Sequence, residues 1–486
     1  MRLKSAKLRN FRCFDELEVQ FHPRLTVLVA DNGGGKTALL DGVAVGLSPI
    51  LGNLSSASQR LSGHGIEDSD FRLVGVEAAR GEDRWVAADH AQVVLEASGG
   101  LTWDVWRPSA GSGPPPTKVG QTDLARHLQA VLESLKTPRP NLLPVVAYYG
   151  ARRGWIVIPE RLRGRKAGQI DYTQPTSALV GALDSLTDFK EMLRWFDVEE
   201  AAELRANKPA LGEMFDHLER SPRLEAVRSA ITTILGAGYT NPHFNERHKF
   251  VVETKSDPKI LQVSQLSQGY QSMLALGMDF ARRLAIANPV LDDFFAGHPE
   301  WEPSVVEYVA AWKPEQVAVD SIGPAWAPAV MLVDEIDLHL HPSWQQRVLG
   351  DLMRAFPGTQ FIVTTHSPQV LSTVKTENIR ILERDSEGRW TASVPDASEV
   401  LGVESSMAMR DIMRVDPTPF NDVVASRSYR DYLNHIESGT QESPKALELR
   451  RELSELYGAR HPLMLDADRL LRFQGYKRRA SPQAND

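Results

Sequence analysis

The chain has 486 residues, of which 42% are hydrophobic and 24% charged, and its net charge is −8. This length predicts two or three domains or one large core with insertions, and the acidic balance argues against binding nucleic acid through bulk charge. Cys13 is the single cysteine, so neither an internal disulfide nor a cysteine-based metal site can form. No apolar run approaches the roughly 18 residues of a membrane span, and residues 1–14 lack the apolar stretch of a signal peptide, so we expect a cytoplasmic protein without a membrane partner.

The first third of the chain predicts strands around one helix. Residues 1–30 read as strands, because KLRNFRCFDELEVQF alternates in part and RLTVLV is a short apolar run that ends before glycines. The elements expected after it are a helix over 38–47, more strands over 70–108, a flexible loop over 109–118, an amphipathic helix over 121–136 and a buried strand over 142–150.

The rest of the chain predicts helices and two more buried strands. AVMLVDE (329–335) and FIVTTH (361–366) are continuous apolar runs, as in a parallel sheet. The other expected elements are a mostly helical region over 176–236, a strand at KFVVET, a helix from near Ser267, an irregular Pro- and Trp-rich segment over 288–328 and a polar helical tail over 398–480. We find neither an internal repeat nor a heptad pattern long enough for an extended coiled coil.

The segment ADNGGGKT (30–37) predicts a phosphate-binding loop. Gly35, Lys36 and Thr37 fit the pattern of Gly, four residues and Gly-Lys-Ser/Thr, although Ala30 stands where the first glycine usually lies. Glycines let backbone N–H groups turn toward an anion, and the following helix adds its positive N-terminal end. Lys36 can reach the β- and γ-phosphates of a nucleotide, and Thr37 can hold Mg²⁺. The alternative is a glycine-rich turn that binds nothing.

Polar residues end the two later apolar strands. Asp334 is placed to hold Mg²⁺, and Glu335 to orient or deprotonate an attacking water. His366 can contact the γ-phosphate or that water, although a lone histidine is more often a satisfied core residue. Because open α/β sheets bind ligands at the carboxyl ends of their strands, three such strand ends favour one shared site.

LSQGYQS (266–272) precedes a predicted helix. Ser267 and Gly269 can donate to a phosphate from this helix start, and the alternative is an ordinary capped helix. In this order, with His366 last, the four motifs resemble those of the ATP-binding cassette ATPases. The opening KLRNFRCFDELEVQF, together with DEIDLHLHPSWQ and FIVTTHSPQVL, is similar to the RecF/SMC-like branch of that superfamily, in its compact stand-alone group. LPVVAYYGARRGW (143–155), the segment 172–196 and EVLGVESSMAMRDIM resemble this narrower group, which includes the ATPase subunit of Septu-type anti-phage systems that also accompanies some retrons.

The resemblance implies an α/β fold: an ABC/RecF-like ATPase head with mixed and parallel sheets, a helical insertion lobe and a helical C-terminal tail. Its expected parts are residues 1–150 with the phosphate loop, a mainly helical lobe over 151–260, the second part of the head over 261–395 and a helical partner-docking region over 396–486. It also implies ATP and Mg²⁺ as ligands.

The resemblance implies roles for individual residues. ATP would be bound by Asp31, Asn32, Gly33, Gly34, Gly35, Lys36 and Thr37. Asp334 and Thr37 would hold the metal, Glu335 would serve the water and His366 would be the switch histidine. Ser267 and Gly269 would meet the γ-phosphate of ATP held by a second protomer, Asp337 would lie in the loop that crosses the dimer interface, and Arg12 would lie near the nucleotide. Gln268 departs from the usual signature, and Gln59 is one of several options for the Gln-loop residue.

Three functions compete. The first is an ATPase that forms an ATP-sandwich dimer or higher oligomer and controls a separately encoded HNH-type nuclease in an anti-phage complex. The acids Glu448, Glu452 and Glu455 follow helical spacing and read as a solvated face rather than a nuclease site. The second is a RecF-like repair ATPase that binds DNA directly through the basic stretch 152–166, which otherwise reads as a solvated loop. The third, a transporter subunit, is disfavoured by the N-terminal strands. His339 and His341 lack a third metal ligand nearby and read as loop residues.

Overall fold

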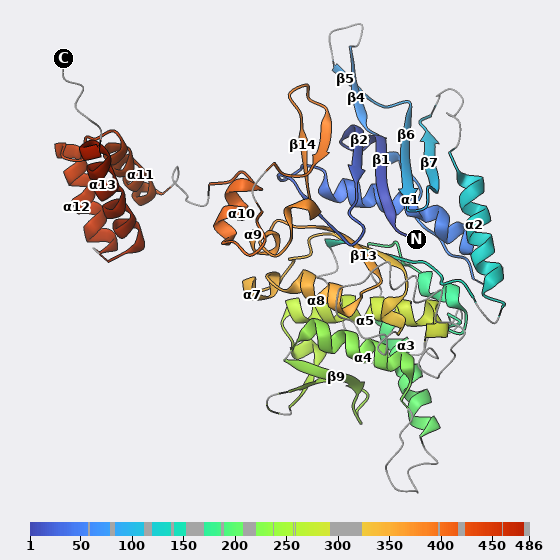
Figure 1. The fold of residues 1–486 in the computed structure, drawn as a ribbon. Coiled ribbons are helices and arrows are strands. Elements are labelled where there is room, and N and C mark those ends of the chain that lie inside the picture. The colour runs from blue at the N-terminus through green and yellow to red at the C-terminus, as the bar shows by residue number, and fades with distance from the viewer. Residues whose placement is uncertain are drawn as a thin grey trace. The chain divides into compact units, whose positions relative to one another are not determined.

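The computed structural model describes two compact units, residues 1–408 and 409–486 (Figure 1). The description covers residues 1–480 except 57–58, 78–82, 111–118, 138–139, 152–169, 186–188, 208–219, 237, 256, 258, 292–322, 397–398, 417–422 and 459. The basic stretch 152–166 and most of the segments 109–118 and 288–328, for which we predicted loops or irregular structure, therefore lie outside the described residues. The three expected parts from 1 to 395 fall in the first unit.

A six-stranded sheet organises the first unit. Its strands, in spatial order, are β15 (Trp390–Ser393), β14 (Ile379–Arg384), β3 (Leu25–Val29), β13 (Thr359–Thr364), β12 (Ala329–Val333) and β8 (Val145–Tyr149). All neighbours from β14 to β8 pair in parallel, and β15 adds an antiparallel edge. Every residue of β3, β12, β13 and β8 is buried, as expected for strands covered on both faces.

A four-stranded antiparallel sheet and helix α1 (Lys36–Leu54) complete the upper part of this unit (Figure 1). The sheet runs β2 (Phe14–Gln20), β1 (Leu3–Phe11), β6 (His90–Ala97) and β7 (Thr102–Pro108), and the hairpin β4 (Leu73–Glu77) and β5 (Asp83–Ala87) stands apart from it. Helix α1 touches β1, β6 and β7 on one side and β12 and β13 on the other, so it lies between the two sheets. Among the described helices, α1 alone is long and apolar enough to cross a membrane, yet most of it is buried in this core.

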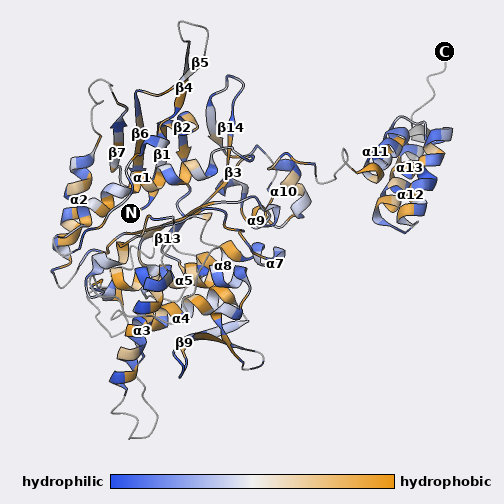
Figure 2. Ribbon diagram, turned by 180° about the vertical axis from the view of Figure 1, so that it is seen from behind, coloured by the Kyte–Doolittle hydropathy of each residue, from blue (hydrophilic) through white to orange (hydrophobic). Residues whose placement is uncertain are grey.

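Helices cover the opposite face of the six-stranded sheet (Figure 2). Helix α5 packs on β8, and α4 packs on both α5 and α8. A small antiparallel sheet of β11 (Ile260–Gln262), β10 (Phe250–Thr254) and β9 (Tyr239–Phe244) packs on α4 through β9. In the residues that the structure describes, the helices of this unit besides α1 are α2 (Gln121–Ser134), α3 (Phe189–Ala206), α4 (Pro222–Leu235), α5 (Gln268–Ala287), α7 (Pro342–Gln345), α8 (Val348–Ala355) and α9 (Pro368–Leu371). Helix α10 (Ser405–Asp411) crosses into the second unit.

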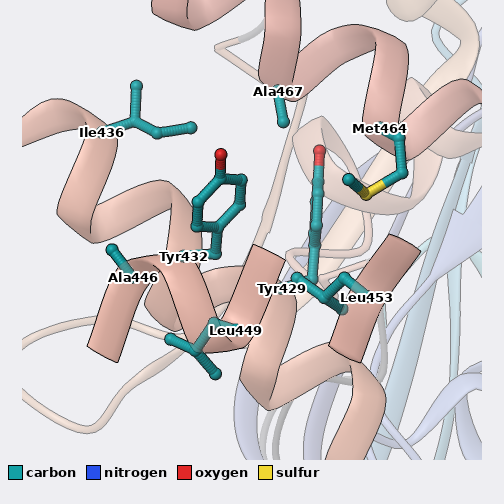
Figure 3. Close-up of a cluster of buried hydrophobic side chains, with 8 residues drawn as sticks. All are labelled: Tyr429, Tyr432, Ile436, Ala446, Leu449, Leu453, Met464 and Ala467. Atoms are coloured by element: carbon teal, nitrogen blue, oxygen red, sulfur yellow. The ribbon is translucent and has the colours of Figure 1, made fainter. Parts of the chain in front are cut away.

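After α10, the described residues of the second unit form three helices with a core of their own. They are α11 (Val424–Glu437), α12 (Pro444–Tyr457) and α13 (Pro462–Ala480). Figure 3 shows Tyr429, Tyr432 and Ile436 of α11 gathered with side chains of α12 and α13. Glu448, Glu452 and Glu455 are exposed on α12, which confirms the prediction of a solvated acidic face.

The predicted fold class is confirmed: the chain has an α/β fold with mixed and parallel sheets, a largely helical lobe and a helical C-terminal region. Helix α1 is longer than the predicted 38–47. The pattern did not predict β14, β15 or β9. β9 contains Asn241 and Pro242, which are depleted in strands, and it forms because β10 pairs with it along the edge.

Candidate nucleotide-binding site

The predicted site residues meet at one edge of the six-stranded sheet. Strands β3, β13 and β12 are neighbours and run in parallel, so their carboxyl ends lie side by side. The loop 30–35 follows β3, His366 follows β13, and Asp334 and Glu335 follow β12. The site thus occupies the edge where open α/β sheets bind ligands.

The loop that follows β3 has a backbone that requires glycine. Gly33 and Gly35 adopt left-handed conformations with φ of 78° and 80°, which side chains disfavour. A Cβ on Gly34 would lie 2.6 Å from the Cβ of Ala30 and 3.0 Å from the Asp31 carbonyl oxygen. Ala30 is outside the left-handed region, so alanine can replace the usual first glycine of the motif here. The loop has the tight turn that a phosphate cradle needs.

Lys36 begins helix α1 and folds back over this loop. Its Nζ donates to the carbonyl oxygens of Ala30 (2.8 Å) and Asp31 (3.2 Å). Burial lowers the pKa of Lys36, although the nearby Asp334 and Asp31 oppose this effect. The ammonium group is therefore held in the loop that would surround a phosphate.

Thr37 and Asp334 are joined directly. The Thr37 hydroxyl donates to Oδ2 of Asp334 at 2.9 Å, and the Thr364 hydroxyl donates to Oδ1 at 2.7 Å. Asp334 is only 2% exposed. Carboxylate and hydroxyl oxygens are hard ligands of the kind that Mg²⁺ prefers, so Thr37 and Asp334 fit the expected metal.

Glu335 and the residues after it form a second group of contacts. Glu335 has a left-handed backbone with φ of 50°, and its N–H donates to the Thr364 hydroxyl at 2.7 Å. Asp337 accepts a 2.6 Å hydrogen bond from the Thr365 hydroxyl and a 3.4 Å bond from the N–H of His366. The acidic loop after β12 is thus tied to Thr365 and His366 after β13.

The start of helix α5 lies against this acidic loop. Ser267 is the exposed N-cap residue, and its side chain makes no capping hydrogen bond. A Cβ on Gly269 would lie 2.6 Å from the carbonyl oxygen of His339, so a side chain there would push the two segments apart. His341 caps α7, because its Nδ1 accepts from the N–H of Ser343. The structure therefore brings Gly269 to the loop that contains Asp337.

Arg12 lies beside the phosphate loop and is held by two acids. Its guanidinium forms ion pairs with Asp41 of α1 and with Asp70, the latter at 2.8 Å. The Tyr148 hydroxyl donates to the other oxygen of Asp41 at 2.7 Å. These four residues border a polar cavity of about 200 Å³. A Cβ added to Gly35 would touch the side chain of Cys13, which follows Arg12 in the chain. Arg12 is therefore next in sequence to a residue that packs on the loop.

Three residues of this network were missed by the sequence analysis. Thr364, Asp41 and Tyr148 make the contacts above. Thr364 and Tyr148 lie inside the quoted segments FIVTTHSPQVL and LPVVAYYGARRGW, but no role was predicted for any of the three. Thr364 and Tyr148 lie at the ends of apolar strands, and Asp41 lies one helical turn after Thr37. Polar residues at strand ends are a signal that could have drawn attention to Thr364.

The chain is similar to known ATPases over most of its length. The family description "AAA domain, putative AbiEii toxin, Type IV TA system" matches residues 171–372, and "AAA domain" matches residues 5–194. The Retron Ec83 probable ATPase of Escherichia coli is 26% identical over 94% of this chain and 84% of its own. The Retron Vc95 probable ATPase of Vibrio cholerae is 23% identical over 93% and 86%.

Two further likenesses are partial. The Septu protein PtuA of Bacillus mycoides is 41% identical over 61 residues, which is 13% of this chain and 9% of that protein. The match to the solved SMC head domain from Thermotoga maritima covers 81% of this chain and 99% of that chain, at 14% identity and a TM-score of 0.33.

The AAA matches together include the loop 30–37, the acidic pair Asp334 and Glu335, and His366. The chain is an ATPase, and two stretches of it are similar to AAA domains. Its predicted resemblance to the RecF/SMC-like ATPases and to retron and Septu ATPases is confirmed. Because an ATPase must bind its nucleotide, this chain binds a nucleotide.

Proposed function

We propose that this ATPase is a cytoplasmic, ATP-driven switch that closes into a dimer around ATP and Mg²⁺. We further propose that it is the ATPase subunit of an anti-phage defence complex and controls a separate HNH-type nuclease. The observation that carries the switch is the convergence of the phosphate loop, Asp334, Glu335 and His366 at one sheet edge, with α5 packed on the loop after Asp337.

Each residue of the edge has a chemical role in this proposal. The N–H groups of residues 31–37 and the Lys36 ammonium bind the β- and γ-phosphates. Thr37 and Asp334 would hold Mg²⁺, which would supply positive charge to neutralise the phosphates. Glu335 orients the attacking water and accepts its proton, and His366 contacts the γ-phosphate.

The position of Ser267 supports the proposed dimer. Its hydroxyl is exposed and makes no capping bond to its own helix, so it is available to the γ-phosphate of ATP held by a second copy. Gly269 leaves room for the acidic loop of its own chain. Phosphate contacts present only in the closed state would then stabilise the dimer until hydrolysis removes them.

The defence role is supported by the retron ATPases, which resemble this chain along nearly its whole length, and by the short PtuA match. The separate helical unit 409–486 offers a surface for a partner, with Leu447, Leu456 and Phe473 more than half exposed. We propose that the nuclease binds there.

The test uses the Glu335→Gln variant, which should bind ATP, hydrolyse it very slowly and remain closed. The variant is purified from its native host with ATP and its companions are identified by mass spectrometry. The matched control is Lys36→Ala, which should not bind ATP and should be monomeric. A stoichiometric small nuclease with Glu335→Gln would support the defence complex.

Other outcomes would contradict parts of the proposal. If Glu335→Gln stayed monomeric with ATP in size-exclusion chromatography, the composite site would be wrong. If it came with DNA and repair proteins instead of a nuclease, and its DNA affinity fell steeply with salt, the RecF-like alternative would replace the defence role.

A further inference from the structure

Thr364 stands at the centre of the acidic end of the site. It is the last residue of β13, fully buried, and lies between Asp334 and Glu335 on the neighbouring strand end. One hydroxyl makes two bonds: it donates to Oδ1 of Asp334 and accepts from the N–H of Glu335, both at 2.7 Å. The Thr364 carbonyl oxygen also accepts from the N–H of Ile336 at 2.9 Å. A single residue therefore holds three successive residues of the acidic loop.

The two hydroxyl bonds have separate consequences for the two acids. On Asp334 the bond takes Oδ1, so Oδ2 is the oxygen that faces Thr37. On Glu335 the bond satisfies a backbone donor in a left-handed conformation with φ of 50°, which a glutamate rarely adopts without support. Water is not a ready substitute, because Thr364 has no exposed surface.

We propose that Thr364 is a positioning residue for ATP hydrolysis, whose hydroxyl sets the metal-facing oxygen of Asp334 and the direction of Glu335 at the same time. This inference rests on the proposed hydrolysis of ATP at this site. Thr364 acts through the two acids and touches neither the nucleotide nor the water. Residues that orient metal ligands in this way change metal affinity or activity about 10–100-fold when removed.

The test compares Thr364→Val, which keeps the shape and loses the hydroxyl, with Thr364→Ser, which keeps the hydroxyl. Thr26→Val is the matched control, because Thr26 is also fully buried on the same sheet and accepts a hydrogen bond from the N–H of His22. Thr26 lies near the start of β3, away from the carboxyl ends of the strands where the acidic pair lies. Thr364→Ala provides a second loss of the hydroxyl if the valine variant does not fold.

Two quantities are measured for each variant. The first is the affinity for a fluorescent ATP analogue with Mg²⁺ and with EDTA, and the second is kcat and KM for ATP. For Thr364→Val we expect unchanged affinity in EDTA, a roughly 10-fold smaller gain from Mg²⁺ and a kcat lower by about 10–100-fold. Thr364→Ser should restore both, and Thr26→Val should match the wild type.

The inference is overturned if Thr364→Val keeps the wild-type gain from Mg²⁺ and the wild-type kcat, or if Thr26→Val loses as much. The inference is also overturned if Thr364→Val binds the ATP analogue more weakly in EDTA, because a loss without Mg²⁺ indicates a structural role. If the wild type itself does not hydrolyse ATP, the proposed function fails, and that result is distinct from a wild type and a valine variant that are equally active.

Discussion

Two glycines near the opposite ends of α1 differ in the space around them. Gly34 lies in the phosphate loop, where an added Cβ would meet the Cβ of Ala30 at 2.6 Å. Gly52 lies in the last turn of α1, where an added Cβ would meet nothing within 4 Å. The same substitution at the two positions thus separates the needs of the loop from those of the helix.

We predict that Gly34→Ala weakens ATP binding. Forcing a methyl group into a packed site costs about 1–3 kcal/mol, and about 1.4 kcal/mol is a factor of ten in affinity. Isothermal titration calorimetry should therefore show a loss of affinity of about 5- to 150-fold. Gly52→Ala should leave ATP affinity unchanged and stabilise the helix by about 0.5–1 kcal/mol. Equal affinities for the two variants would contradict the assignment of the loop.

Helix α5 contains a buried ionic cluster in the turns that follow its exposed N-terminal end. Asp279 is fully buried and forms ion pairs with Arg282 and Arg283 at 2.7 Å. The Tyr149 hydroxyl donates to Asp279 at 2.9 Å, and the Tyr149 carbonyl oxygen accepts from the N–H of Asp334. The cluster thus ties α5 to the strand next to β12.

We predict that Asp279→Asn strongly destabilises the first unit. Removing one partner of a buried ion pair costs about 3–5 kcal/mol, because the other charges stay buried without compensation. Urea unfolding measures this loss. The control is Asp123→Asn, which removes an exposed ion pair with Arg126 on α2. That surface pair contributes at most about 1 kcal/mol, so equal losses at the two positions would refute the importance of the cluster.

The same cluster predicts how the stability of the first unit changes at acidic pH. Burial alone would raise the pKa of Asp279, but Arg283 and Arg282 outweigh it and lower the pKa to about 2, from 3.8 in the unfolded chain. A lowered carboxyl pKa contributes stability above pH about 4 that is lost as the pH falls toward 2. Between pH about 4 and pH 2, the free energy of unfolding should thus fall more for the wild type than for Asp279→Asn.

The strand ends show how much of the site could be predicted. Lys36, Asp334 and Glu335 follow apolar runs and carry recognisable motifs, and strand pairing confirmed that these runs are neighbours. Thr364 could not be assigned a role, because its hydroxyl acts across two strands that are 25 residues or more apart along the chain. Asp41 and Tyr148 likewise meet only through tertiary packing. Local pattern indicates which residues reach an edge, and the partners at that edge depend on the sheet order.

The candidate nucleotide site and the proposed docking surface lie in different units of the chain. Every candidate site residue lies in the unit 1–408. The unit 409–486 has its own core, in which α11, α12 and α13 bury Tyr432, Ile436, Leu453 and Ala467 (Figure 3). The two parts can therefore be tested apart.

We predict that a chain ending at Asp416, which keeps α10 whole, binds ATP with wild-type affinity but no longer retains the nuclease partner. The physical reason is that the truncation leaves the core of the first unit and all its site contacts intact, while it removes the helices with exposed Leu447, Leu456 and Phe473. Titration with a fluorescent ATP analogue and copurification measure the two properties. The control is full-length Lys36→Ala, in which ATP binding should be lost while α11–α13 remain. If a truncated chain with an unchanged melting temperature failed to bind ATP, the C-terminal unit would have to take part in the nucleotide site. If it still retained the nuclease, docking would have to be assigned to the first unit.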